Sequence, residues 1–542
     1  MKKSIFVAAG VFCAVILHTH ALCLAVDQDS TFSKSEVIVA GADTVRLATD
    51  LYLPKGAGPF PCILLRTPYN KNGSKGDAEK FVNQGYAVVV QDCRGTGKSK
   101  GRFYAFRYER EDGLATVDWI RTQSWSNGRI GGWGGSYVGY TQWIIADKLN
   151  AIAAALTTAD MYDGLYPSGL FSLALAANWG LIMNHPKIKP EKLMASYRTL
   201  PLSLADDSTG AANAFFDDWL RHPHNDDYWQ AQAFRRPVAT PAFSIAGWYD
   251  IFLEAQIKDF VALGKRRHPN SRLIIGPFAH GQIAIPTDYG DAGKMGRLYD
   301  LARSFLAQTI KDPVEAPVYA DSLMNKPFAY FIIHANKWVL SKQWPPEQSK
   351  PVRYYLGPSS TLSTNKPTKA EKATYVYDPQ NPYPSLGGTF LGIGVGPAWQ
   401  NSNVERTDQV VFESDTLSAP LTLLGPLQAE LYVASDAAST DFFACLQDVQ
   451  PDGKIVNIQE GGQQVQGGKK IRRIRFSLWA AGYQLAVGHK LRVVICSSLF
   501  PRYNRNLNNG EPIFSAARSR IATQTVSWGP KHPSHLILPI IP

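Results

Sequence analysis

The chain has 542 residues, of which 45% are hydrophobic and 19% are charged, and its net charge is +11. A chain of this length is expected to fold as about three domains, and the low share of charged residues excludes a disordered or tail-dominated protein. The basic residues are dispersed, with no run of five or more like charges, so the sequence predicts no nucleic-acid groove.

The first 25 residues have the pattern of a secretory signal peptide. Two lysines follow Met1, an apolar run covers residues 5–17, and small residues at Ala21 and Ala25 offer cleavage points. The apolar run is too short to span a bilayer. We therefore expect residues 1–25 to be a signal peptide, and the mature protein to be exported, periplasmic or secreted, without stable membrane insertion.

Four cysteines remain after the predicted cleavage: Cys62, Cys93, Cys445 and Cys496. Each lies in an apolar run typical of a buried strand, where a free thiol behaves as a small hydrophobic group. An exported protein could pair them as disulfides, and the sequence leaves this open. None of the four stands at metal-ligand spacing with another, and we predict neither a metal site nor a cofactor.

Residues 26–158 begin with a hairpin over residues 35–54 and then alternate buried strands with helices. The strands are expected at residues 61–66, 86–91, 129–132 and 151–156, and the helices at residues 77–85, 109–122 and 136–146. This alternation predicts a mostly parallel sheet that is covered by helices on both faces. A glycine-rich loop over residues 92–101 lacks the spacing of a phosphate-binding loop, so we interpret it as a structural turn.

Ser136 lies where a predicted strand meets a predicted helix. Gly134 and Gly135 permit a sharp turn, which would hold the serine oxygen above the sheet beside the free N–H groups of a helix N-terminus. This is the nucleophile elbow of an α/β-hydrolase, although Val138 occupies the usual second glycine position and Gly139 follows it. A glycine-rich turn with an incidental serine is the alternative that this motif alone leaves open.

Residues 159–238 interrupt the alternation with an aromatic-rich stretch of helical or irregular spacing, and we predict that they form an inserted helical cap. The aromatic side chains could line a substrate cleft or serve ordinary helix packing. His222 and His224 flank Pro223, which prevents a helix from aligning the two imidazoles. We interpret this segment as a capped turn and not as a metal site.

The sheet is expected to resume in residues 239–345, which complete the hydrolase core. The expected elements are strands at residues 241–246 and 272–275 and an amphipathic helix at residues 295–310. The second of these strands is expected to be the last of the sheet. Asp250 and His280 follow the two strands closely along the chain.

Residues 346–542 have a different character from the rest of the chain. Short strand runs alternate with turns rich in Gly, Pro and Asn, which is typical of an all-β sandwich. The runs are at residues 352–356, 427–435, 442–449, 472–479, 491–498 and 536–541. We therefore expect a separate C-terminal all-β domain.

A serine nucleophile needs a histidine base, and the histidine needs a carboxylate that orients it. Asp250 and His280 each follow a strand candidate, and their order after Ser136 is that of an α/β-hydrolase. The other histidines lie in the signal peptide, the cap or the β domain, or precede a strand, which leaves His280. The backbone N–H of Tyr137 is one expected oxyanion donor. The phenol of Tyr69 is the other candidate, unless Tyr69 is an ordinary loop residue.

A series of motifs supports this interpretation. In chain order they are Arg66-Thr67-Pro68-Tyr69, Asp92-x-Arg94-Gly95-x-Gly97-x-Ser99-x-Gly101-x-Phe103, Trp125-Ser126-Asn127-Gly128, Gly134-Gly135-Ser136-Tyr137-Val138-Gly139, Gly247-Trp248-Tyr249-Asp250, Gly276-Pro277-x-x-His280 and Ser497-Ser498-x-Phe500-Pro501-Arg502-Tyr503-Asn504-Arg505-Asn506. They resemble the bacterial cocaine esterase and X-prolyl dipeptidyl-peptidase family over nearly the whole mature chain. The resemblance implies an α/β-hydrolase domain with a helical cap and a C-terminal jelly roll. It also implies that Ser136, Asp250 and His280 are the catalytic triad, and that Tyr69 completes the oxyanion hole.

The family divides by substrate. Members that act on α-amino acid esters carry an acidic cluster directly after the triad aspartate, whereas Ile251, Phe252 and Leu253 are apolar here. X-prolyl peptidases of the family usually have an extra N-terminal domain, which does not fit between residues 26 and 35. We therefore expect an exported serine hydrolase that cleaves small-molecule carboxylic esters of a neutral, hydrophobic or aromatic acid through an acyl-enzyme.

Two alternatives remain open. The first is an α-amino acid ester hydrolase, acyl-peptidase or β-lactam side-chain acylase of the same family. The second, from another class, is a catalytically inert secreted protein whose β domain binds carbohydrate, and the intact triad argues against it. The sequence leaves the natural substrate and the oligomeric state open.

Overall fold

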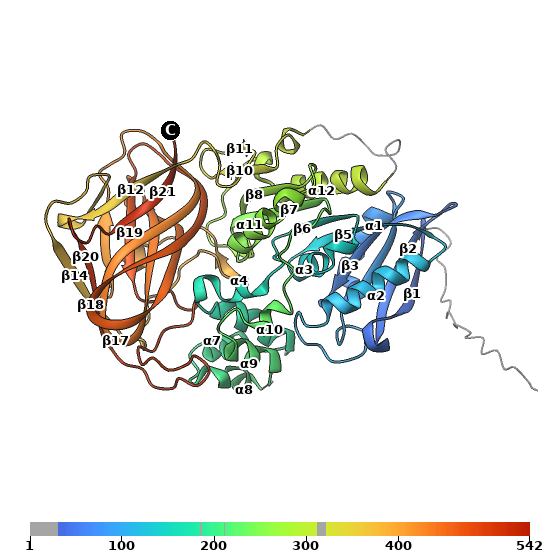
Figure 1. Cartoon of the computed structure of the whole chain (residues 1–542), viewed down its shortest axis with the longest axis horizontal. Coiled ribbons are helices and arrows are strands. Elements are labelled where there is room, and N and C mark those ends of the chain that lie inside the picture. The colour runs from blue at the N-terminus through green and yellow to red at the C-terminus, as the bar shows by residue number, and fades with distance from the viewer. Residues whose placement is uncertain (1–30, 185–186, 211, 312–320) are drawn as a thin grey trace, which may run out of the picture.

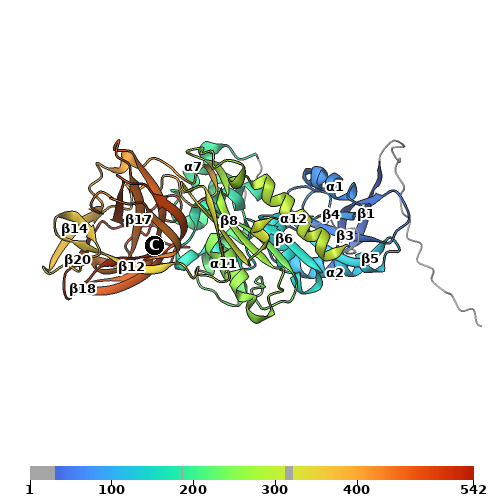
Figure 2. The same cartoon turned by 90° about the horizontal axis from the view of Figure 1, so that it is seen from above.

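The computed structural model describes residues 31–184, 187–210, 212–311 and 321–542, and the predicted signal peptide, residues 1–25, lies outside them. The molecule is elongated, with an α/β part at one end and an all-β domain at the other, and a cluster of short helices lies between them (Figure 1). Figure 2 shows the same order along the long axis from above. Within the described ranges, no helix is long and apolar enough to cross a membrane.

A ten-stranded sheet forms the centre of the α/β part, with the strand order β1-β2-β4-β3-β5-β6-β7-β8-β10-β11. The strands from β4 to β10 run parallel to one another, and β1, β2 and β11 add antiparallel edges. The bounds are β1 Phe32–Ala40, β2 Arg46–Pro54, β3 Phe60–Thr67, β4 Ala87–Asp92, β5 Ser126–Gly135, β6 Ala151–Ala155, β7 Ala242–Tyr249, β8 Arg272–Ala279, β10 Phe328–Ile332 and β11 Lys337–Ser341. The predicted, mostly parallel sheet is therefore present.

Helices cover both faces of this sheet, which explains its continuous apolar strands such as β4 and β7. One face packs against α1 and α12, and the other packs against α2, α3 and α11. Figure 2 shows α1 and α2 on opposite sides of β3 and β4. The bounds of the helices are α1 Lys75–Val82, α2 Glu109–Thr122, α3 Tyr137–Trp143, α11 Leu253–Ala262 and α12 Met295–Ile310.

Between β6 and β7 the chain forms a helical insertion, which corresponds to the predicted residues 159–238. Its helices are α4 Met161–Leu165, α5 Leu173–Leu175, the π-helical turn Ala176–Leu181, α6 Ile182–Asn184, α7 Pro190–Ser196, α8 Ala205–Thr209, α9 Ala214–Arg221 and α10 Asp227–Gln230. The segment after His222 is a turn, in which the Asp226 carboxylate contacts His222 Nδ1 at 2.6 Å and also accepts a hydrogen bond from Tyr228 N at the start of α10. Among the described residues there is no group of three or more potential metal ligands.

The C-terminal domain is a nine-stranded, barrel-like sheet with the order β14-β20-β17-β19-β16-β13-β12-β21, in which β18 pairs with β17 and β17 pairs again with β21. The bounds are β12 Lys350–Gly357, β13 Thr361–Ser363, β14 Glu371–Tyr377, β16 Val410–Glu413, β17 Leu421–Val449, β18 Ile455–Leu485, β19 Lys490–Cys496, β20 Ala522–Trp528 and β21 His535–Ile541. The prediction of an all-β domain is confirmed, and its jelly-roll connectivity stays a prediction.

Two predicted details of the strands are wrong. Strand β8 is not the last strand of the α/β sheet, because β10 and β11 follow α12 and extend its edge. The predicted runs at residues 427–435 and 442–449 both belong to β17, which bends at several register shifts instead of ending between them.

A small parallel sheet links the two domains beside His280. It pairs β9, Gly281–Ile283, with β15, Gly392–Val395. A Cβ on Gly281 would lie 2.1 Å from the carbonyl oxygen of Gly392, so the two backbones approach closely. The C-terminal domain therefore holds the chain directly after this histidine.

Candidate active site

Ser136 lies between β5 and α3 in a strained backbone conformation, with φ 54° and ψ −129°. For a residue other than glycine such a conformation costs about 1–3 kcal/mol and persists only where the surroundings hold it. Ser136 N donates to Ala155 O at 2.9 Å, and Thr157 Oγ1 donates to Ser136 O at 2.7 Å. The serine is thus held by the end of the neighbouring strand.

The glycines around Ser136 are required by close contacts. Gly134 has φ 136°, and a Cβ there would lie 2.4 Å from Val138 Cγ1. A Cβ on Gly139 would lie 2.6 Å from Thr157 Cγ2. The unusual spacing of this elbow therefore has a physical reason: Val138 packs over Gly134, and Gly139 lets α3 approach the residues that follow β6.

Ser136, His280 and Asp250 are joined by hydrogen bonds. Asp250 directly follows β7 and His280 directly follows β8, and both strands are parallel members of one sheet, so both residues lie at its carboxyl edge. His280 Nδ1 lies 2.7 Å from Asp250 Oδ2, and His280 Nε2 lies 3.0 Å from Ser136 Oγ. Asp250 is fully buried, and its other oxygen accepts a bond from Phe252 N at 2.8 Å. Because an ionised carboxylate can only accept, Nδ1 carries the proton and Nε2 is free to accept from the serine.

The two expected oxyanion donors, the backbone N–H of Tyr137 and the phenol O–H of Tyr69, lie beside Ser136. Tyr137 is the first residue of α3, so its backbone N–H has no acceptor within the helix. The phenol of Tyr69, which follows β3, accepts a hydrogen bond from Trp179 Nε1 at 2.9 Å. Desolvation raises the pKa of Tyr69 more than its hydrogen bonds with Trp179 and Ser136 lower it. The phenol therefore stays protonated at neutral pH, although 44% of the residue is exposed.

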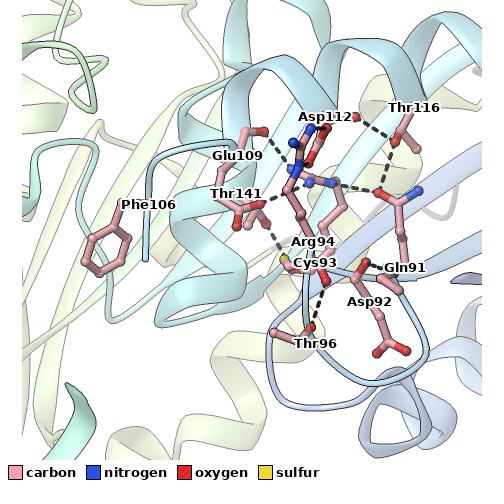
Figure 3. Close-up of polar contacts among 12 residues, drawn as sticks. Gln91, Asp92, Cys93, Arg94, Thr96, Phe106, Glu109, Asp112, Thr116 and Thr141 are labelled. Carbon is pink, nitrogen blue, oxygen red and sulfur yellow. Dashed lines mark hydrogen bonds and ion pairs between the residues drawn. The ribbon is translucent and has the colours of Figure 1, made fainter. Parts of the chain in front are cut away.

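The ring of Tyr137 is anchored by a buried ion pair. Its hydroxyl donates to Glu109 Oε1 at 2.9 Å and accepts from Phe106 N at 2.9 Å. Glu109 pairs with Arg66 at 3.0 Å, and both side chains are buried. Figure 3 shows Glu109 and Gln91 in this polar cluster. Gln91 accepts a hydrogen bond from Arg66 Nε at 2.9 Å. No motif in the sequence predicted this role of Glu109.

A cavity of about 220 Å³ opens onto Ser136 and His280. Besides Tyr69 and Tyr137, its other lining side chains are all apolar or aromatic: Phe106, Met161, Leu165, Leu175, Trp179, Trp219, Ile251, Phe252 and Leu391. Among the residues that the structure describes, no acidic residue lines it. Glu254 interacts instead with the backbone of Ala480 and with Lys258, and burial raises its pKa to about 7.

The C-terminal domain and the helical insertion both contribute to this cavity. Leu391 precedes β15, and its carbonyl accepts a hydrogen bond from Asn178 Nδ2 at 2.5 Å. Tyr197 in turn donates to Asn178 Oδ1. Trp179 is one of the cap aromatics for which the sequence left cleft lining and ordinary helix packing open, and it lines the cavity. Leu391 was not predicted as a site residue, because nothing in the local sequence brings it to Ser136.

A serine on a strand-to-helix turn, bonded to a histidine that is bonded to a buried aspartate, defines a serine hydrolase, and the sheet order and flanking helices are those of the α/β-hydrolase fold. Residues 43–282 match the X-Pro dipeptidyl-peptidase (S15 family), and residues 323–537 match the X-Pro dipeptidyl-peptidase C-terminal non-catalytic domain. The chain belongs to the cocaine esterase and X-prolyl dipeptidyl-peptidase family of serine hydrolases.

Individual relatives support this assignment. A cocaine esterase from Rhodococcus sp. (strain MB1 Bresler) is 32% identical, and the match covers 94% of this chain and 98% of the esterase. An aminopeptidase from a marine sediment archaeon, Thaumarchaeota archaeon, has a TM-score of 0.83 at 22% identity and covers 98% of this chain and 100% of its own. An α-amino acid ester hydrolase has a TM-score of 0.79 at 23% identity, and the match covers 97% of this chain and 99% of the hydrolase. These two structures show a shared fold.

Proposed function

We propose that Ser136 is the nucleophile of an acyl esterase, with His280 as its general base and Asp250 as the group that orients the base. The hydrogen-bond chain of 3.0 and 2.7 Å through the three residues supports this assignment. Ser136 Oγ attacks the ester carbonyl carbon while its proton passes to His280 Nε2. Asp250 stabilises the imidazolium that forms.

The remaining steps use His280 as the proton carrier. His280 gives it to the departing alkoxide, so the alcohol leaves and Ser136 carries the acyl group as an ester. Water then attacks the acyl carbon and transfers a proton to His280, which returns it to Ser136 Oγ as the free acid leaves. In both tetrahedral intermediates the oxyanion accepts hydrogen bonds from the Tyr137 backbone N–H and the Tyr69 phenol.

The substrate is proposed to be an ester of a neutral, hydrophobic or aromatic acid. The observation that carries this proposal is the cavity beside Ser136, hereafter the acyl cavity, whose wall is mostly apolar and, in the described part of the chain, holds no carboxylate. An apolar acyl group gains about 25 cal/mol for each Å² of surface that it buries there. The helical insertion, residues 159–238, acts as a cap over this cavity, because Met161, Trp179 and Trp219 line it.

The relative named α-amino acid ester hydrolase makes the corresponding activity a second candidate for this chain. The absence of a carboxylate from the described cavity wall disfavours it, because an ammonium group needs a partner when it leaves water. The inert carbohydrate-binding alternative is disfavoured by the hydrogen-bonded serine. Export to the periplasm or the medium remains a proposal that is based on residues 1–25, and cell fractionation tests it.

The function is tested with the purified mature protein and a panel of esters, amides and β-lactam side-chain substrates. We expect the fastest turnover with esters of arylacetic or benzoic acids, and labelling of Ser136 by a fluorophosphonate probe. Ser136→Ala should abolish the label. An unlabelled wild-type protein would refute the esterase proposal, and preferred cleavage of α-amino acid esters would support the second candidate.

A further inference from the structure

Trp179 donates a hydrogen bond to the phenol that we assign to the oxyanion hole. It lies in the π-helical turn Ala176–Leu181 of the helical insertion, and its Nε1 is 2.9 Å from Tyr69 Oη. Turns of this type are rare and frequently occur at functional sites. The bond joins residues 110 positions apart in the sequence.

The direction of this bond determines where the phenol proton can point. An indole N–H is only a donor, so Tyr69 Oη is the acceptor and cannot direct its own proton toward Trp179. The Ser136 hydroxyl also interacts with the phenol, and both hydrogen bonds lower the pKa of Tyr69 relative to burial alone. The proton is therefore left for the side of the phenol where Ser136 lies and where the oxyanion forms.

The indole is itself held in place by the aromatic residues of the elbow. It stacks on Tyr137 with a centroid distance of 5.5 Å and an interplanar angle of 16°. It also stacks on Phe106 at 5.5 Å and 15°. Because Tyr137 and Phe106 are hydrogen-bonded to each other, the side chains around both oxyanion donors form one packed unit.

We propose that Trp179 is a positioning residue that orients the Tyr69 phenol toward the oxyanion and strengthens it as a donor. Donation into a phenol oxygen polarises its O–H bond, so the effect grows as negative charge develops on the substrate. This inference rests on the proposed role of Tyr69. Trp179 acts through Tyr69 in addition to lining the acyl cavity, and the two roles affect different kinetic constants.

The test is a double-mutant cycle of Trp179→Phe and Tyr69→Phe, assayed with a phenylacetate ester. Trp179→Phe removes the N–H donor and should lower kcat about 10-fold, the range of one net hydrogen bond. Tyr69→Phe should lower kcat by about 10²–10³-fold. In the Tyr69→Phe background, Trp179→Phe should cause no further loss of kcat beyond that of the packing control.

Trp219→Phe is the packing control. Trp219 lines the same cavity and stacks on Phe106 at 6.0 Å, but its Nε1 has no hydrogen-bond partner among the described residues. Any fall of kcat in this variant measures the cost of a smaller aromatic side chain in the cavity wall. The effect of Trp179→Phe on kcat is corrected by this factor. Replacing Trp179 by benzothienylalanine, which keeps the ring shape and lacks the N–H, repeats the test without a change in packing.

The outcomes separate the two proposals. A loss of kcat on Trp179→Phe that persists undiminished in the Tyr69→Phe background, or an effect confined to KM, would overturn the positioning role and leave Trp179 as a cavity wall. Unchanged kcat in Tyr69→Phe itself would instead refute the proposed oxyanion role of Tyr69. A loss that disappears in the Tyr69→Phe background supports the inference.

Discussion

Esters of phenylacetic acid and of phenylglycine with the same alcohol differ only in an α-ammonium group, and we expect the enzyme to prefer the neutral acyl group. The wall of the acyl cavity includes Ile251 and Phe252 directly after the proposed triad aspartate, and none of its described side chains is acidic. Glu254, the nearest carboxylate in the sequence on that side, interacts with Lys258 and Ala480 outside the cavity wall.

The size of this preference follows from desolvation. An ammonium group that enters an apolar cavity without a partner loses several kcal/mol of hydration free energy, although a cavity that is open to water lets it keep part of its hydration shell. We therefore take about 1.4 kcal/mol as the lower limit, which corresponds to a ratio of about 10 in kcat/KM between the two esters.

The assay measures kcat/KM for both esters over a pH range that spans the pKa of the phenylglycine amine. Any pH dependence of the enzyme itself affects both esters and cancels in the ratio. The ratio should be at least about 10 below the pKa of the amine and approach 1 above it. Ile251→Asp should reduce the ratio at low pH, whereas Ile251→Asn, which has a similar shape and no charge, should retain it. Equal or faster turnover of the protonated phenylglycine ester by the wild type would refute the reasoning.

Three further predictions concern stability and the elbow. Gly139→Ala should destabilise the protein by about 1–3 kcal/mol and lower kcat, because its Cβ would lie 2.6 Å from Thr157 Cγ2. Gly296→Ala in α12 is the control and should be neutral or stabilising, because a Cβ there meets nothing within 4 Å. Glu109→Gln should cost about 3–5 kcal/mol in urea unfolding, since it leaves the buried Arg66 without its charge partner. Burial raises the pKa of Asp441 from 3.8 to about 7, so its contribution to stability is present below pH 3.8 and is lost as the pH rises through about 7. Asp441→Asn should therefore raise the melting temperature more at pH 8 than at pH 4.

One result would contradict each of these three predictions. Equal melting temperatures for the Gly139 and Gly296 variants would show that α3 can move away from β6 without cost. Unchanged stability of Glu109→Gln would mean that the buried pair contributes little. A pH-independent effect of Asp441→Asn would show that this carboxyl does not titrate differently in the folded and unfolded protein.

The sequence predicted best the elements whose pattern is local. The amphipathic spacing of α2 predicted Glu109–Thr122, and the apolar spacing of α12 predicted Met295–Ile310, in agreement with the structure. Predictions from the sequence were wrong where tertiary contacts determine the bounds of an element. Whether β17 ends or bends near residue 435 depends on register shifts against β18, which a local pattern does not contain.

The same distinction applies to the site. The motifs around Ser136, Asp250 and His280 predicted a constellation that the structure brings into hydrogen-bond contact. Leu391 could not be predicted in this way, and for Trp179 the sequence left cleft lining and helix packing open, because each reaches the cavity from a part of the chain more than 40 residues from Ser136. Their positions depend on how the helical insertion and the C-terminal domain pack on the hydrolase core.

The central claim is that Ser136, His280 and Asp250 act as one catalytic unit, and the kcat of single and combined variants on one phenylacetate ester tests it most directly. Ser136→Ala should lower kcat by about 10⁴-fold or more, and adding His280→Ala or Asp250→Ala to it should cause little further loss, because the residues act together. Near-wild-type activity of Ser136→Ala, or losses that multiply independently, would contradict the claim.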